Sequence, residues 1–212
     1  DAERQAVAEV LATPVLSIGC RVVEFEQALA AYVGARNAIA VSSGTAALHL
    51  GMVAAGVDCG DAVITSPFSF IASANVVLYQ RAFPAFVDID SDTLNLDVEQ
   101  VASAAVDLAG SWSTRRAWLP PSERGEDRGG VGTLGALLPV AVFGQPAELR
   151  SIARTAIAHG VPVIEDASEA VGAEYHGVRI GSSISSWADE KVRHATCFSF
   201  YPNKQMTTGE GG

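Results

Sequence analysis

Cysteine is scarce in this sequence, and neither cysteine nor histidine is spaced for metal binding. The three cysteines, Cys20, Cys59 and Cys197, lie far apart among the 212 residues, and the four histidines are equally scattered. Structural metal sites and disulfide frameworks place Cys and His at short, recurring spacings. We therefore expect reduced thiols and predict no metal site.

Basic residues are also few. The chain has 14 Lys and Arg against 24 Asp and Glu, which gives a formal net charge of -10. Binding a nucleic acid through a broad surface requires an excess of basic side chains, so we predict no nucleic-acid partner. An anionic small molecule is compatible with this balance, because a few backbone N–H groups can bind an anion as well as Lys or Arg can.

The sequence shows no export signal and no clear membrane span. It begins with Asp1, Glu3 and Arg4, without a basic segment followed by an apolar one. Two stretches, Ala38–Val57 and Ala62–Gln80, contain no Asp, Glu, Lys or Arg. Both include several serines together with His, Pro or Asn, which suits buried strand and helix units better than contact with lipid. We predict a cytoplasmic protein with no membrane partner.

The chain does contain a regular alternation of short apolar runs and longer helix-like stretches. Its 49% hydrophobic and 18% charged composition indicates a globular protein, and the alternation is typical of a parallel sheet covered by helices. The expected strands span Ala38–Val41, Ala62–Thr65, Pro84–Val87, Leu137–Val142 and Val161–Glu165, with a further strand-like run at Thr196–Phe200. The expected helices span Thr45–Ala55, Ile71–Tyr79, Asp97–Ala105 and Pro146–His159. The sequence predicts an α/β fold with a mostly parallel sheet and helices on both faces.

Several of these helices carry end signals. Asp97, with Gln100 three residues later, resembles a capping box, and Gly160 follows a helix where a left-handed cap would lie. Near the N-terminus, apolar side chains recur at helical spacing, at Val22, Val23, Phe25, Leu29 and Tyr32. We predict that residues 1–36 form a helical segment packed on a large domain, which comprises residues 37–212.

Two stretches break the alternation. Residues 111–133 contain two prolines, four arginines and several glycines without periodicity, so we predict an exposed, mobile loop there. Residues 182–194 mix serines with charged side chains. Either stretch could be a substrate lid or a surface insertion.

Polar residues follow three of the apolar runs. In a parallel α/β sheet, ligands collect at the carboxyl ends of the strands. The run from Ser42 to Leu48 places a small-residue turn at the start of a helix, where free N–H groups face an anion. Asp166 follows one strand, and Lys204 follows the run at Thr196–Phe200. Taken singly, the turn is compatible with an ordinary helix cap, Asp166 with a cap or loop residue, and Lys204 with a solvated surface charge.

Considered together, the motifs of this chain resemble those of the DegT/DnrJ/StrS family of sugar aminotransferases, which are fold-type I enzymes that bind pyridoxal 5'-phosphate. The resemblance covers nearly the whole chain. It rests on Glu24-Phe25-Glu26, Tyr32-Val33-Gly34, the run Ser43 to Leu50, Asp61 to Thr65, Val87 to Asp90, Leu94-Asn95-Leu96, Phe143-Gly144-Gln145-Pro146, Ile164 to Ala170 and Phe198 to Lys204. It implies that residues 37–212 form the cofactor-binding large domain, and that the family's small C-terminal domain is absent from this sequence.

The resemblance implies two catalytic residues. Lys204 matches the lysine that holds the cofactor as a Schiff base and then moves a proton between substrate carbon and cofactor, which requires a fraction of neutral amine. Asp166 matches the carboxylate that faces the pyridine nitrogen and keeps it protonated, so that the ring can accept electrons.

The resemblance also implies the cofactor-binding residues. Gly44, Thr45 and the backbone N–H of Ala46 match the phosphate site at a helix N-terminus, and Ser199 matches a hydroxyl that reaches the same phosphate. Phe70 matches the aromatic residue that stacks on the cofactor ring, with core packing as the alternative.

Glu169 departs from the family pattern, because many members carry Gln beside the ring's phenolic oxygen. A charged carboxylate would repel a phenolate there. Glu169 must therefore share a proton with that oxygen, be neutral, or turn away.

The implied activity is transfer of an amino group from an amino acid, with glutamate favoured, to a nucleotide-linked keto sugar, as in amino-sugar, polysaccharide or antibiotic biosynthesis. The implied assembly is a homodimer with active sites across its interface. One alternative is a dehydratase of the same family, in which the lysine is typically replaced by histidine, so Lys204 favours transamination. The other alternative is a non-catalytic regulatory or scaffolding relative, against which the joint presence of Asp166, Ser199 and Lys204 argues.

Overall fold

The computed structural model describes residues 1–126, 129–184 and 192–212, which form two compact units. One unit comprises residues 1–40 and the other residues 41–212. The sheet and every predicted site residue lie in the second unit.

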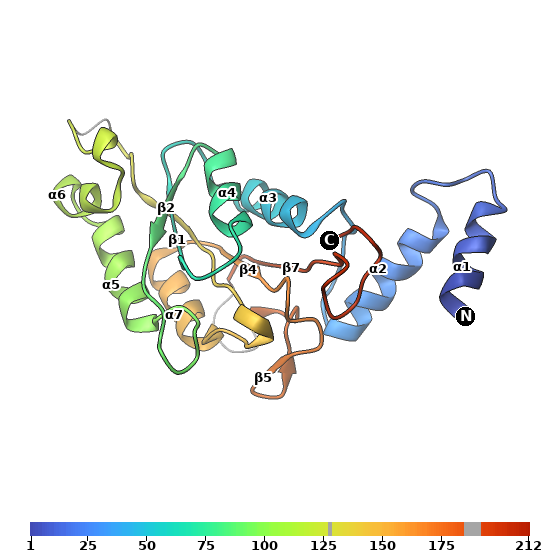
Figure 1. The fold of residues 1–212 in the computed structure, drawn as a ribbon. Helices are drawn as coiled ribbons and strands as arrows, with labels where there is room; N and C mark the ends of the chain where they lie inside the picture. The colour runs from blue at the N-terminus through green and yellow to red at the C-terminus, as the bar shows by residue number, and fades with distance from the viewer. Residues whose placement is uncertain (127–128, 185–191) are drawn as a thin grey trace. The chain divides into compact units, whose positions relative to one another are not determined.

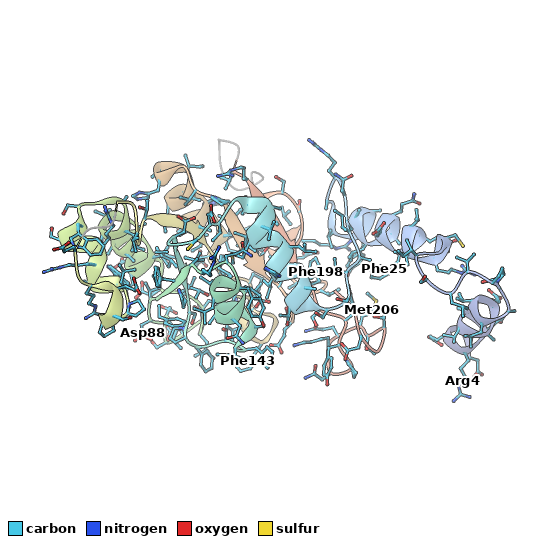
Figure 2. The ribbon with its side chains drawn as sticks, turned by 90° about the horizontal axis from the view of Figure 1, so that it is seen from above. Arg4, Phe25, Asp88, Phe143, Phe198 and Met206 are labelled. Atoms are coloured by element: carbon cyan, nitrogen blue, oxygen red, sulfur yellow. The ribbon has the colours of Figure 1, made fainter. Side chains whose placement is uncertain are left out.

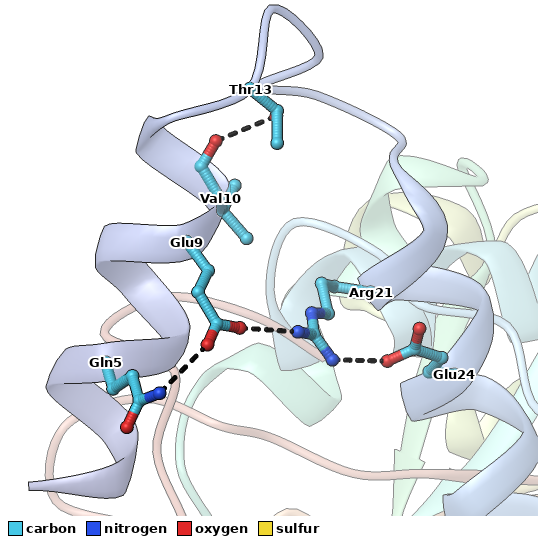
Figure 3. Close-up of polar contacts among 6 residues, drawn as sticks. All are labelled: Gln5, Glu9, Val10, Thr13, Arg21 and Glu24. Atoms are coloured by element: carbon cyan, nitrogen blue, oxygen red, sulfur yellow. Dashed lines mark hydrogen bonds and ion pairs between the residues drawn. The ribbon is translucent and has the colours of Figure 1, made fainter.

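The first unit contains two helices, α1 (Ala2–Leu11) and α2 (Cys20–Val33). The predicted N-terminal amphipathic helix is confirmed as α2, which ends at Gly34 in the left-handed conformation. Arg21 joins the two helices, because its guanidinium donates to Glu9 at 2.9 Å and to Glu24 at 2.8 Å (Figure 3). All residues of α1 are at least partly exposed.

The second unit is built on a five-stranded sheet with the order β2-β1-β3-β4-β7, in which every pairing is parallel. Its strands are β1 (Ala62–Thr65), β2 (Phe83–Phe86), β3 (Leu134–Leu137), β4 (Val163–Asp166) and β7 (His194–Cys197). The edge strand β2 contains Pro84, which lacks the N–H needed in a central strand. The predicted α/β fold with a parallel sheet is confirmed.

Helices cover both faces of this sheet (Figure 1). The main helices are α3 (Gly44–Ala55), α4 (Ala72–Tyr79), α5 (Val98–Ala109) and α7 (Leu149–His159). The α3 and α4 helices pack on one another and on one face, where Leu48, Met52 and Val76 bury against Val63 and Ile164. The α5 and α7 helices pack together on the other face. Burial of these apolar side chains is the main stabilising contribution to the unit.

Most predicted elements agree with the structure to within one to four residues, and the exceptions have local causes. The expected strand Leu137–Val142 is instead β3, which ends at Leu137. Pro139 has no N–H for the ladder, and beyond it the pairing resumes as a single parallel bridge between Val140 and Asp166. The expected helix from Pro146 begins three residues later, at Leu149, and the Pro146 carbonyl outside the helix accepts a side-chain hydrogen bond from Asn95.

The expected strand Ala38–Val41 is wrong. Residues 37–41 have no regular secondary structure. Val41 exchanges two backbone hydrogen bonds with Gly212, at 2.9 and 3.0 Å, but pairing at a single residue does not form a ladder. An apolar run alone therefore did not distinguish a strand from an extended segment.

The expected loop at residues 111–133 is wrong in part. It contains a short helix α6 (Trp112–Arg115) and two 3₁₀ turns, η1 (Arg116–Trp118) and η2 (Pro121–Glu123). Leu119 is buried, and Arg115 and Arg124 donate to backbone carbonyls within the segment. Of the second irregular stretch, residues 185–191 lie outside the described residues.

The helix-end predictions are largely confirmed. Asp97 caps α5 by accepting from the N–H groups of Glu99 and Gln100, and Gly160 follows α7 with φ of 67°. The Gln100 amide bonds to the Asp97 carboxylate and to the Asp88 N–H, so the reciprocal half of the capping box is replaced.

The described chain contains further short elements. A hairpin of β5 (Glu174–Tyr175) and β6 (Val178–Arg179) was not predicted. Its His176-Gly177 turn has positive φ at both residues, as tight hairpin turns commonly do, but His-Gly is not one of the usual dipeptides for such a turn. A third 3₁₀ turn is η3 (Val142–Gly144). Within the described part of the chain, none of the helices combines the length and apolar character of a membrane span.

Truncation of Leu108 tests the packing of α5. Leu108 is fully buried, so Leu108→Ala should lower the free energy of unfolding by about 2–5 kcal/mol through lost burial and a cavity. Val106 on the same helix is 63% exposed, and Val106→Ala should change it by less than about 0.5 kcal/mol. Urea unfolding measures both, and equal effects would contradict the described orientation of α5.

Candidate functional site

A cavity of about 760 Å³ lies beyond the carboxyl ends of β3, β4 and β7. This volume is in the range of small-molecule sites. Seven of the eight predicted site residues line it, namely Gly44, Thr45, Phe70, Asp166, Glu169, Ser199 and Lys204. The parallel order of the sheet explains their meeting, because neighbouring strands end at one edge.

Asp166 is the buried carboxylate of the cavity. It is the last residue of β4 and is 5% exposed. One carboxylate oxygen accepts from the Ser73 hydroxyl at 2.6 Å, and the other accepts from the Ser168 N–H at 3.1 Å. These hydrogen bonds fix its orientation and offset part of the cost of burying a charge.

Ser73 was missed by the sequence analysis. It lies on α4 and is fully buried, on the stripe that also carries Val76 and Val77. A hydroxyl on an apolar helix face needs a partner, which was the available signal. The sequence did not reveal that this partner lies 93 residues away.

Lys204 and Glu169 form an ion pair at the cavity. The Lys204 amine lies 3.0 Å from a Glu169 carboxylate oxygen, and the two side chains are 15% and 39% exposed. The turn that carries Lys204 is closed by its backbone N–H, which donates to the Tyr201 carbonyl. Glu169 thus faces the amine.

The first turn of α3 gives the other wall. Ser43 is its N-cap, and the Ser43 hydroxyl accepts from the Ala46 N–H at 3.1 Å. Ala46 is the one predicted site residue that does not line the cavity. The N–H groups of Gly44 and Thr45 belong to the orphan donors that every helix N-terminus presents.

Gly44 allows this helix to approach Ser199. A Cβ at Gly44 would lie 2.8 Å from the Ser199 Cβ, closer than such atoms pack. Ser199 is 7% exposed and follows β7. The lack of a side chain at Gly44 is therefore what brings the Ser199 hydroxyl to the helix N-terminus.

Aromatic residues surround the remaining side. Phe70 is 76% exposed and is not part of the apolar core of this unit. Phe68, Phe143 and Tyr201 also line the cavity, and Phe143 is labelled in Figure 2. Exposed aromatic side chains at a concave site are available to contact a ligand.

Charge at the cavity is predominantly acidic. Among the described lining residues, Lys204 is the single basic one, whereas Asp166, Glu169 and Glu210 are acidic. Any anionic group bound here must rely on hydroxyls and on the helix dipole of α3 as well as on Lys204.

The thiol nearest the site is unsuited to nucleophilic chemistry. Cys197 pairs with Asp166 in the sheet and is buried. Burial raises the pKa of the Cys197 thiol far above its usual value, and the Asp166 and Glu165 carboxylates raise it further. All three cysteines are free, and Cys20 and Cys59 are exposed. No group of three potential metal-ligating side chains occurs among residues 1–126, 129–184 and 192–212.

This parallel sheet, with a lysine, a buried carboxylate and a helix N-terminus around one cavity, has the architecture that is expected of a fold-type I aminotransferase. The model of the DegT/DnrJ/EryC1/StrS aminotransferase family matches residues 1–212, and the chain belongs to this family.

Individual relatives agree with this assignment. GDP-perosamine synthase from Caulobacter vibrioides is 39% identical over 211 residues, 99% of this chain and 48% of the relative. EpsN from Bacillus subtilis, whose name describes a pyridoxal phosphate-dependent aminotransferase, is 36% identical over 92% of this chain and 43% of its own. A family aminotransferase from Brucella abortus superposes with a TM-score of 0.81 at 31% identity, over 98% of this chain and 49% of that one. The chain thus spans about half the length of these relatives.

Substitution of Gly44 tests the close approach of α3 to Ser199. Gly44→Ala forces the helix and Ser199 apart, so we expect a loss of about 1–3 kcal/mol in the free energy of unfolding. At Gly125 an added Cβ would meet nothing within 4 Å, so Gly125→Ala is the matched control. Denaturant unfolding measures the free energy of unfolding of both variants. An unchanged value for Gly44→Ala would show that α3 packs less closely against Ser199 than described.

Proposed function

We propose that the protein to which this chain belongs is a pyridoxal 5'-phosphate-dependent aminotransferase. It moves an amino group from an amino acid, with glutamate favoured, to a nucleotide-linked keto sugar. The single observation that carries this proposal is the meeting of the Lys204 amine, the buried Asp166 carboxylate and the α3 N-terminus at one cavity.

The residues present fit the cofactor. When bound, pyridoxal phosphate supplies an aldehyde for covalent attachment and an electron-accepting ring. The cavity offers an amine for the aldehyde, a fixed carboxylate for the ring nitrogen, and helix N–H groups with the Ser199 hydroxyl for the phosphate. Its volume of about 760 Å³ also leaves room for a substrate.

Lys204 is proposed to hold the cofactor and to move a proton at the reacting carbon of the substrate. A proton can be accepted only by a neutral amine, and Lys204 is paired here with Glu169 at 3.0 Å. Covalent attachment of the cofactor requires the amine to leave this partner. Glu169 would then lie beside the ring, where it must share a proton with the phenolic oxygen, be neutral, or turn away.

Asp166 is proposed to contact the pyridine nitrogen. Ser73 and Ser168 restrain both carboxylate oxygens, so little reorientation is needed when the ring enters. Phe70 is proposed to pack against the ring face.

The phosphate is proposed to bind at the first turn of α3. Gly44, Thr45 and Ser199 line the cavity and supply its first donors. The Ala46 N–H is engaged by Ser43, so it joins only when the Ser43 hydroxyl rotates away. The helix dipole favours a dianion at this end.

The substrate class is supported by the family and by the similarity to GDP-perosamine synthase. We also propose a homodimer, because the described lining is acidic and a cofactor phosphate would benefit from basic side chains supplied by a second subunit.

The role of Lys204 can be tested on the full-length protein. The 212 residues contain two lysines, Lys191 and Lys204. We expect wild type and Lys191→Ala to bind pyridoxal phosphate with a visible absorbance band that borohydride abolishes by fixing the cofactor to the protein. Lys204→Ala should lose this band. A borohydride-fixed cofactor in Lys204→Ala would contradict the assignment.

Addition of glutamate to the wild-type protein then tests the reaction. Glutamate should convert the aldehyde band to that of the amine form, as transamination requires. A band that glutamate leaves unchanged would favour the dehydratase alternative, and a protein that never acquires the band would favour the scaffolding alternative.

Ser73→Ala tests the support of Asp166. The variant leaves one oxygen of a buried carboxylate without its donor, so the affinity for pyridoxal phosphate should fall about tenfold, equivalent to about 1.4 kcal/mol. Ser103→Ala, at an exposed position of α5, is the control. Titration with cofactor measures both, and wild-type affinity in Ser73→Ala would remove Ser73 from the site.

A further inference from the structure

The loop that carries Phe143 has an unusual backbone. Phe143 has φ of 52° and ψ of 24°, which is the left-handed region. A non-glycine residue there costs about 1–2 kcal/mol. Such a cost is often offset by burial of a large side chain, but Phe143 is 74% exposed. Its one described ring contact is an edge-on approach to Phe68, with centroids 6.0 Å apart.

Asn95 holds this loop in place. It is 2% exposed. Its amide nitrogen donates to the carbonyls of Gln145 and Pro146, at 3.0 and 3.1 Å, and its amide oxygen accepts from the Val142 N–H at 3.1 Å. One buried side chain therefore binds the backbone on both sides of Phe143, and a change of its register would break three hydrogen bonds.

The same loop is fixed against the catalytic side of the cavity. Gly144 has φ of 84°, and a Cβ there would lie 2.7 Å from the Glu169 carbonyl oxygen. Glu169 in turn pairs with Lys204. The backbone at Phe143 is thus held beside the cavity that contains the amine, and the exposed Phe143 ring lines that cavity.

The ring of Phe143 is exposed, its backbone is in the left-handed region, and buried Asn95 holds that backbone in place. The stability of the fold does not explain this combination. Strained residues of this kind cluster at ligand sites. We propose that Phe143 contacts the sugar ring of the nucleotide-linked substrate, and that Asn95 is the residue that positions it. This inference rests on the proposed function. The keto carbon must reach Lys204, so the sugar is the part of the substrate that lies deepest, beside Phe143, and the nucleotide lies farther out.

The test uses the full-length protein loaded with cofactor and non-reacting probes. UDP-glucose, GDP-mannose and dTDP-glucose carry a hexose without the keto group, and UDP, GDP and dTDP lack the hexose. Calorimetry identifies the probe that wild type binds most tightly. Phe143→Ala should raise the Kd for that nucleotide hexose about five- to tenfold and leave the Kd for its nucleoside diphosphate unchanged.

Two further variants keep the result independent of folding. Phe143→Gly removes the ring and also the left-handed strain, so it should weaken hexose binding while its thermal stability stays equal to wild type or rises. Phe86→Ala removes a half-exposed ring, 46% exposed, at a position that does not line the cavity. It should leave both Kd values unchanged.

Asn95→Asp tests the positioning role. The carboxylate keeps an acceptor for Val142 but has no donor for Gln145 and Pro146, so hexose affinity should fall as in Phe143→Ala. Because Asn95 acts through Phe143, the double variant should bind the hexose no more weakly than Phe143→Ala alone. Additive losses, or a loss of stability without a change in Kd, would refute the positioning role.

Each remaining outcome separates the two proposals. Wild-type hexose affinity in Phe143→Ala and Phe143→Gly would overturn the contact. Equal weakening of hexose and diphosphate would move the ring to the nucleotide and also overturn it. If the wild-type protein binds no cofactor, or binds none of the three nucleotide hexoses, the proposed function is wrong. The inference about Phe143 is then wrong as well.

Discussion

The structure depends on a charge that must be buried at the end of a strand. A carboxylate that is 5% exposed is unfavourable unless its oxygens are hydrogen-bonded. Asp166 obtains one donor from its own turn, at Ser168, and the other from α4, at Ser73. The second donor requires the first turn of α4 to lie close enough to the end of β4 for the Ser73 hydroxyl to reach Asp166, and α3 packs beside α4. The cavity therefore forms beyond the carboxyl ends of the strands, beside the first turns of α3 and α4.

The parallel topology of the sheet brings the other residues of the site together. The strands β3, β4 and β7 are neighbours in the sheet although they are separated in sequence by long connections. Their carboxyl ends carry the Phe143 loop, Asp166, and the segment with Ser199 and Lys204. Functional side chains from three distant stretches of the sequence therefore lie at one edge of the sheet. This happens because each connection between parallel strands returns the chain to the opposite edge before the next strand begins.

Sequence reasoning succeeded where a pattern is local. Apolar runs located β1, β2 and β4 to within two residues, and glycine marked the end of α7. It failed where tertiary pairing decides, as at Ala38–Val41. The grouping of Asp166 and Lys204 at one cavity was foreseen through motif resemblance, whereas Ser73 was not. The identity of a hydroxyl's partner depends on the packing of α4, and no local pattern records that.

Some residues adopt a backbone conformation that is unfavourable for their side chain. Such residues lower the stability of the fold, and they indicate positions where another requirement, such as ligand binding, decides the residue. Two non-glycine residues next to the Asn95 clamp, Leu94 and Phe143, have positive φ values of 61° and 52°. Glycine or asparagine would adopt this region at lower cost. At Phe143 the chain has a large aromatic side chain where a small one would be favoured, although a glycine, Gly144, occupies the next position. Such conflicts between residue and backbone concentrate at binding sites, and this one lies at the cavity and not within the sheet.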